Sequence, residues 1–176
     1  PWRYRLLHDQ IVDEPGEDTE ISVRTLVEVD IKLRIGSGVD SMIEDLEGLD
    51  NGDEILRDLQ DGATSCLIEA WDLMASVGRA EPKSDLSYVH LPSISEHEQN
   101  RYFEDWTNLV ALVRTSWLRV IAESETAGRR AIERWMSVNY PLFRRLAFFG
   151  LAKSTCFTGS ESLAYLLEDD SWWLWS

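Results

Sequence analysis

The chain has 176 residues, of which 44% are hydrophobic, and a formal net charge of −15 at pH 7. This length is sufficient for a domain with a sizeable core. The acidity opposes broad contact with the phosphate backbone of nucleic acids. The longest apolar run, residues 146–152, is far shorter than the ~20 residues of a membrane-spanning helix, so we expect a soluble protein without a membrane partner. Its two cysteines give no disulfide framework, which favours a cytoplasmic location.

The N-terminal part is acidic and its secondary structure is ambiguous. Residues 9–20 hold six acidic side chains with Pro15 and Gly16, which is typical of a surface loop. In residues 21–35 aliphatic side chains alternate with mostly polar ones, a period that favours a half-buried strand. The run is much longer than an average strand of ~5–6 residues, and no partner strand is evident nearby. We therefore predict a helix for 21–35.

Residues 39–78 predict three short helices. Two apolar stripes at helical spacing flank a turn at Asp50-Asn51-Gly52, and a third stripe runs through residues 62–77. Cys66 falls within the third stripe, so we expect a buried, reduced thiol there, whereas Cys156 lies in a polar loop. Gly78 is a suitable residue to end this helix.

Residues 79–97 contain two prolines and four serines, which predicts an irregular connector. We expect this connector to separate an acidic helical subdomain, 1–78, from a Trp-rich helical-repeat subdomain, 98–176. The chain stops at the aromatic run SWWLWS, and we expect the parent protein to continue beyond residue 176.

The second half has clear helical periodicity. Apolar side chains three and four residues apart predict helices over 100–122 and 127–136, and Pro141 fits the first turn of a third. Thr158 and Glu161 have the spacing of a capping box that opens a fourth. Four aromatic residues are predicted to be core: Trp106, Trp117, Trp135 and Phe143. We expect an all-α fold, an irregular α-solenoid of antiparallel helix pairs that resembles HEAT repeats.

Motifs for catalysis or metal binding are missing from the sequence. Residues 50–54 lack the ligand order of a calcium loop, and His97-Glu98 has no second histidine at position 101. The glycines around Ser37 lack the lysine of a phosphate loop, and neither cysteine is paired by sequence with a histidine. We therefore predict no catalytic residue, no cofactor and no metal site.

Basic residues concentrate in the second half. Residues 99–153 hold nine basic and five acidic side chains, whereas residues 1–80 hold seven and nineteen. The favoured interpretation is a set of solvated helix faces and ion pairs with the acidic half. The alternative is a surface that binds phosphates or an acidic partner, because arginine and tryptophan dominate binding energy at many interfaces. Its candidate residues are Arg129, Arg130, Arg144, Arg145, Trp172, Trp173 and Trp175.

Residues 85–176 carry several distinctive motifs. They are a connector with Pro92, Ser93, Ile94, His97, Gln99, Asn100 and Arg101, then Trp106 and Trp117 on one helix, then the YPLFRRLA element at 140–147. This part resembles a C-terminal helical region of large bacterial multidomain proteins. Several of those carry a sirtuin-like or nucleotide-binding effector domain and look like antiviral defence proteins. The resemblance implies a recognition or scaffolding role and assigns no catalytic residue.

Three classes of function remain open on the sequence. The favoured one is a non-catalytic helical scaffold or sensor region of a larger bacterial protein. Its partner would be another protein or an effector domain of the same parent chain, with nucleic acid less favoured. The second class is a free-standing acidic inhibitor that mimics DNA. The third is an enzyme whose residues the motifs do not reveal.

Overall fold

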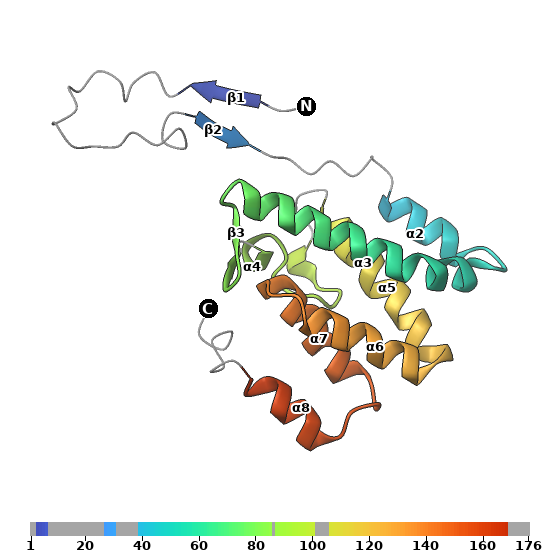
Figure 1. The fold of residues 1–176 in the computed structure, drawn as a ribbon. Helices are drawn as coiled ribbons and strands as arrows, with labels where there is room; N and C mark the ends of the chain where they lie inside the picture. Colours follow the sequence, from blue (N-terminus) through green and yellow to red (C-terminus); the bar gives the residue numbers. More distant parts are fainter. Residues whose placement is uncertain (1–2, 7–26, 31–38, 86, 101–105, 169–176) are drawn as a thin grey trace, which may run out of the picture. The chain divides into compact units, whose positions relative to one another are not determined.

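The computed structural model describes residues 3–6, 27–30, 39–85, 87–100 and 106–168 (Figure 1). The chain divides into two compact units, residues 1–33 and residues 34–176. In its described part the chain is mainly helical, with seven α-helices and two short two-stranded sheets. The predicted predominance of helix is therefore confirmed.

The described part of the first unit is a pair of strands. Strand β1 (Arg3–Leu6) pairs antiparallel with β2 (Val27–Asp30), and Arg3 lies opposite Asp30. The predicted helix over 21–35 is wrong at Val27–Asp30; the rest of that segment lies outside the described residues. The alternating pattern was the correct signal, and the partner strand lies more than 20 residues earlier in the chain.

The second unit begins with α2 (Val39–Glu47) and α3 (Gly52–Ser76). The turn between them is where we predicted it, but the two stripes after it form a single long helix. A Cβ atom at Gly52 would lie 1.7 Å from the backbone oxygen of Leu46, so only glycine permits this close approach. Gly78 has a φ of 74° and ends α3 as predicted. Its N–H bonds Ala75 O at 3.0 Å, one of the bonds of a Schellman motif.

The predicted connector contains short regular elements. Strands β3 (Ala80–Glu81) and β4 (Ser84–Asp85) form a small hairpin, followed by α4 (Ser87–His90) and the 3-10 turn η2 (Glu98–Asn100). Helix α3, before this segment, packs against α5, after it, and both belong to the same compact unit. The segment placed by the sequence at a subdomain boundary thus lies within one packed unit.

Four further helices complete the second unit. They are α5 (Thr107–Glu123), α6 (Glu125–Met136), α7 (Pro141–Lys153) and α8 (Gly159–Leu166). Pro141 occupies the first turn of α7, and Thr158 with Glu161 forms the capping box of α8, both as predicted. Helix α5 packs on α3 and α6, and α6 packs on α7 (Figure 1).

The core of this unit is aromatic. Trp117, Trp135 and Phe143 are fully buried and Trp106 is 8% exposed, so all four predicted core aromatics are confirmed. The indole N–H of Trp117 donates to the backbone oxygen of Gly128 at 3.0 Å, which satisfies the polar edge of this ring. Cys66 is exposed, contrary to prediction, because the buried side of α3 passes through its neighbour Leu67 instead.

Candidate functional site

Arginines of the second half pair with carboxylates of the first. Arg119 lies 2.7 Å from Glu47 and 2.6 Å from Asp53, and these two pairs join α5 to α2 and α3. Arg134 of α6 lies 3.3 Å from Asp61 of α3. The interpretation of the basic residues as ion-pair partners of the acidic half is therefore confirmed for these arginines.

Arg144 is not on the surface, although the sequence placed it in the candidate partner surface. Its side chain on α7 is 5% exposed; its Nη1 lies 3.4 Å from Glu168 Oε2 and 3.7 Å from the sulfur of Met136. The sequence predicted that Arg144 lies at the edge of its helix, but both Arg144 and its neighbour Phe143 are buried. Arg144 is therefore corrected to a packing residue.

Arg145 is half-buried, and its guanidinium group is also hydrogen-bonded within the protein. Its Nη1 donates to Ser87 Oγ at 3.2 Å, and its Nη2 donates to the backbone oxygen of Leu91. Burial lowers the pKa of this guanidinium, and the nearby carboxylate of Asp85 opposes that effect. Arg145 therefore joins α7 to the α4 segment, and it is a half-buried contact residue instead of the exposed edge residue that we predicted.

A buried carboxylate organises the same region. Asp85 is 5% exposed and accepts three hydrogen bonds: from the indole N–H of Trp71 at 3.0 Å, from the backbone N–H of Ser87 at 2.9 Å and from the backbone N–H of Leu142 at 3.1 Å. The last bond satisfies a free N–H in the first turn of α7. Asp85 therefore joins α3, α4 and α7, and its role is structural.

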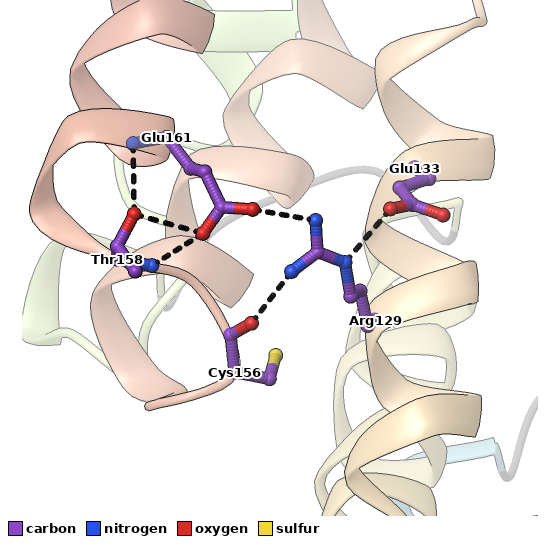
Figure 2. A network of polar contacts seen from close by, with 5 residues as sticks. All are labelled: Arg129, Glu133, Cys156, Thr158 and Glu161. Carbon is purple, nitrogen blue, oxygen red and sulfur yellow. Dashed lines mark hydrogen bonds and ion pairs between the residues drawn. The ribbon is translucent and has the colours of Figure 1, made fainter.

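Arg129 is engaged in a network that holds α8 near α6 (Figure 2). Its guanidinium donates to Glu133 at 2.9 Å, to Glu161 at 2.8 Å and to the backbone oxygen of Cys156 at 2.8 Å. The same group stacks 4.2 Å from the centroid of the Phe157 ring. No residue of α8 is buried, so this network is a main attachment of that helix within the described structure.

The network predicts that the Glu161 carboxyl group titrates at an unusually low pH. The backbone N–H of Thr158, then the side chain of Arg129, then the Thr158 hydroxyl lower the pKa of Glu161 from 4.5 to about 2. Because the folded-state pKa is depressed, the stabilisation is complete above pH 4.5 and is lost as the pH falls towards 2. A carbon-detected NMR titration of the Glu161 carboxyl group should give a midpoint near 2.

Replacing Arg129 by Gln should raise that midpoint towards the ordinary value of 4.5, because the second-largest cause is removed. Arg130→Gln is the matched control, since the neighbouring arginine has no contact with Glu161 and should leave the midpoint unchanged. A midpoint in the Arg129→Gln protein equal to that of the wild type would show that the pair does not form in solution.

Arg130 is the exposed member of the four candidate arginines, and it borders a hollow of about 360 Å³. Arg134, one turn further along α6, and Arg57 of α3 line the same hollow. The remaining lining residues are Gln60, Asp61, Val120, Ala127 and Ala131. Sequence reasoning missed Arg57 because it is a single basic residue in an acidic segment, and only the packing of α3 near α6 brings it to this place.

A second hollow, of about 340 Å³, lies beside Arg114 of α5. Arg114 donates to the backbone oxygen of Ile94 at 3.2 Å and to Glu96 at 3.0 Å. Burial lowers the pKa of this guanidinium, and Glu96 opposes that effect. Asn100 donates to the backbone oxygens of Ser93 and Ser95, so its amide also holds the loop. These groups fix the 91–100 segment on α5.

Acidic side chains gather on α2, α3 and the turn between them. Ten carboxylates are exposed there: Glu44, Asp45, Glu47, Asp50, Asp53, Glu54, Asp58, Asp61, Glu69 and Asp72. The same stretch contains a single basic residue, Arg57, which lies 2.6 Å from Glu123. We call these ten residues the acidic face.

The described residues contain no group of three or more His, Cys, Asp or Glu side chains that could hold a metal ion. Among the helices described, none is both long and apolar enough to cross a bilayer. Trp172, Trp173 and Trp175 lie outside the described residues, so the predicted aromatic part of the partner surface stays a prediction. No protein-family model, curated protein or solved structure matches the chain.

Proposed function

We propose that the chain is a non-catalytic helical recognition region whose acidic face binds a basic surface on a protein partner. The observation that carries this proposal is the separation of charge on the second unit. Ten exposed carboxylates occupy α2, α3 and their turn, and within the described structure only three of them, Glu47, Asp53 and Asp61, pair with arginines of α5 and α6. The one arginine in this stretch, Arg57, is paired with Glu123. Complementary charge accelerates encounter and excludes partners of the wrong sign.

The arrangement along α3 supports a protein partner. Glu54, Asp58 and Glu69 are exposed, and Glu69 lies one helical turn before Leu73, which is 38% exposed. Leu59, which follows Asp58 in the chain, is 36% exposed. Carboxylates beside leucines fit a surface that combines lysine or arginine with apolar contacts. Nucleic acid is disfavoured at this face because its phosphates and the carboxylates carry charge of the same sign.

The resemblance of residues 85–176 to bacterial multidomain defence proteins supports an effector domain of the same parent chain as this partner. An irregular solenoid is part of the proposal, because α3, α5, α6 and α7 pack in chain order. The bond from Leu142 N–H to Asp85 closes α7 back onto the α4 region, so the proposed solenoid would be a compact one.

The acidic inhibitor that mimics DNA is the second candidate, since the same face favours it. The two candidates differ in the partner. A DNA mimic occupies the DNA-binding surface of its target, so duplex DNA competes with it for that target. A scaffold partner bound through another surface is not displaced by DNA.

The test is crosslinking with a reagent that joins carboxylates directly to lysines, applied to the chain in cells of its own host. We expect crosslinks from the acidic face to lysines of one partner, and Glu54→Gln/Asp58→Asn/Glu69→Gln should weaken retention of that partner. The three substitutions would remove three exposed ion pairs with the partner. At about 0.5 kcal/mol each, the loss is about 1.5 kcal/mol, or roughly tenfold in affinity.

The control is Glu81→Gln/Glu98→Gln/Glu125→Gln, which changes the net charge by the same amount outside the acidic face. This protein should retain the partner as the wild type does. Equal weakening by both triple variants would mean that net charge alone matters, and retention by the first variant at the wild-type level would remove the acidic face as the binding surface.

A further inference from the structure

We propose that the hollow between α3, α5 and α6 binds a small molecule through its phosphate group. Its walls carry three arginines from two helices, Arg57 on α3 and Arg130 and Arg134 on α6. In a chain of net charge −15, a hollow with three guanidinium groups around it is a departure from the general composition. The hollow shares Asp61 with the acidic face, but this inference does not depend on a protein partner binding there.

Each guanidinium keeps donors available for a ligand. Arg57 uses its Nε on Glu123 at 2.6 Å, and Arg134 uses one nitrogen on Asp61 at 3.3 Å and one on Ser65 at 2.9 Å. A guanidinium has five N–H donors, so both retain others. Arg130 makes no hydrogen bond or ion pair with any other described residue. All N–H donors of its guanidinium group are therefore available to a ligand.

The charges around the hollow do not cancel. Asp61 and Glu123 are the carboxylates paired with its arginines, which leaves three positive groups against two negative ones. Arg130 and Arg134 are also one helical turn apart, a spacing at which like charges repel. A bound anion would remove this repulsion and complete the pairing.

The geometry favours phosphate over carboxylate. Arginines approach the hollow from both α3 and α6, and a tetrahedral phosphate presents oxygens in more directions than a planar carboxylate does. The volume of about 360 Å³ is at the small end of the range for ligand sites, so it leaves room for an attached organic group. Val120, Ala127 and Ala131 offer that group an apolar surface.

Binding is measured by NMR chemical-shift titration of the whole chain with three probes: inorganic phosphate, phenyl phosphate and benzoate. We expect saturable shifts at α3 and α6 with phenyl phosphate, weaker binding of inorganic phosphate, and no saturable binding of benzoate. Arg130→Gln should weaken the affinity for phenyl phosphate by about tenfold or more, the effect expected when a charged hydrogen-bond donor is lost. The fold should be unaffected because Arg130 is exposed.

Arg79→Gln is the control, an exposed arginine of equal charge outside the hollow. It should bind phenyl phosphate as the wild type does. A second variant, Ala127→Leu, fills the hollow without changing the charge. It should weaken the affinity for phenyl phosphate more than the affinity for inorganic phosphate.

Three results would overturn the proposal. They are the absence of saturable shifts with either phosphate probe, equal weakening by Arg130→Gln and Arg79→Gln, and benzoate binding as tight as phenyl phosphate. The first would leave the hollow as a solvent-filled groove, the second would indicate attraction by general charge, and the third would assign the site to carboxylates.

Discussion

Asp85→Ala should lower the free energy of unfolding by about 3–5 kcal/mol. The carboxylate accepts hydrogen bonds from Trp71, Ser87 and Leu142, and all three donors would lose their partner in the buried interior. Arg145 would also lose the nearby negative charge that offsets its burial. Chemical denaturation monitored by tryptophan fluorescence measures the change.

Two variants bracket this result. Asp85→Asn keeps one acceptor oxygen, so we expect a loss smaller than that of Asp85→Ala. Asp72→Ala removes an exposed carboxylate that accepts a hydrogen bond from the Tyr140 hydroxyl at 2.9 Å, and it should cost less than about 1 kcal/mol. If Asp85→Ala were as stable as Asp72→Ala, Asp85 would not be the residue that joins α3, α4 and α7.

Trp117→Ala is expected to cost about 3–5 kcal/mol, the range for large aromatics removed from packed cores. Its ring is fully buried and lies 5.8 Å from the ring centroid of Trp135 and 5.9 Å from that of Phe149. The change would also leave the backbone oxygen of Gly128 without its indole donor. The loss should appear in the denaturation midpoint, and in lower yields of soluble protein.

Tyr88→Ala is the matched control, because it also removes an aromatic ring but from a side chain that is 59% exposed. Its unfolding free energy should stay within about 0.5 kcal/mol of the wild type. A similar effect from both substitutions would indicate that Trp117 does not pack in the core as the structure shows.

Several features of the fold were predictable because they depend on residues close together in the chain. The capping box of Thr158 and Glu161, the proline at the start of α7 and the glycine after α3 each involve contacts within about one helical turn. The buried aromatics were predictable because the helical period places them on one face.

The errors involve contacts between distant residues. The strand at Val27–Asp30 needs Arg3–Leu6 as its partner, and the alternating pattern cannot say where that partner is. The three predicted helices of 39–78 became two because α3 continues through Gly62, where packing against α5 outweighs the weak helix propensity of glycine.

The candidate site shows the same division. The sequence by itself determined the helices of the second half, the excess of acid in the first half and the positions of the arginines in the second. Only the tertiary structure decided that Arg144 is buried, that Arg129 holds α8, and that Arg130 faces a hollow. The physical reason is that an arginine has the same local sequence signal whether it is solvated, ion-paired or buried. Which of these applies depends on the partners that other helices bring to it.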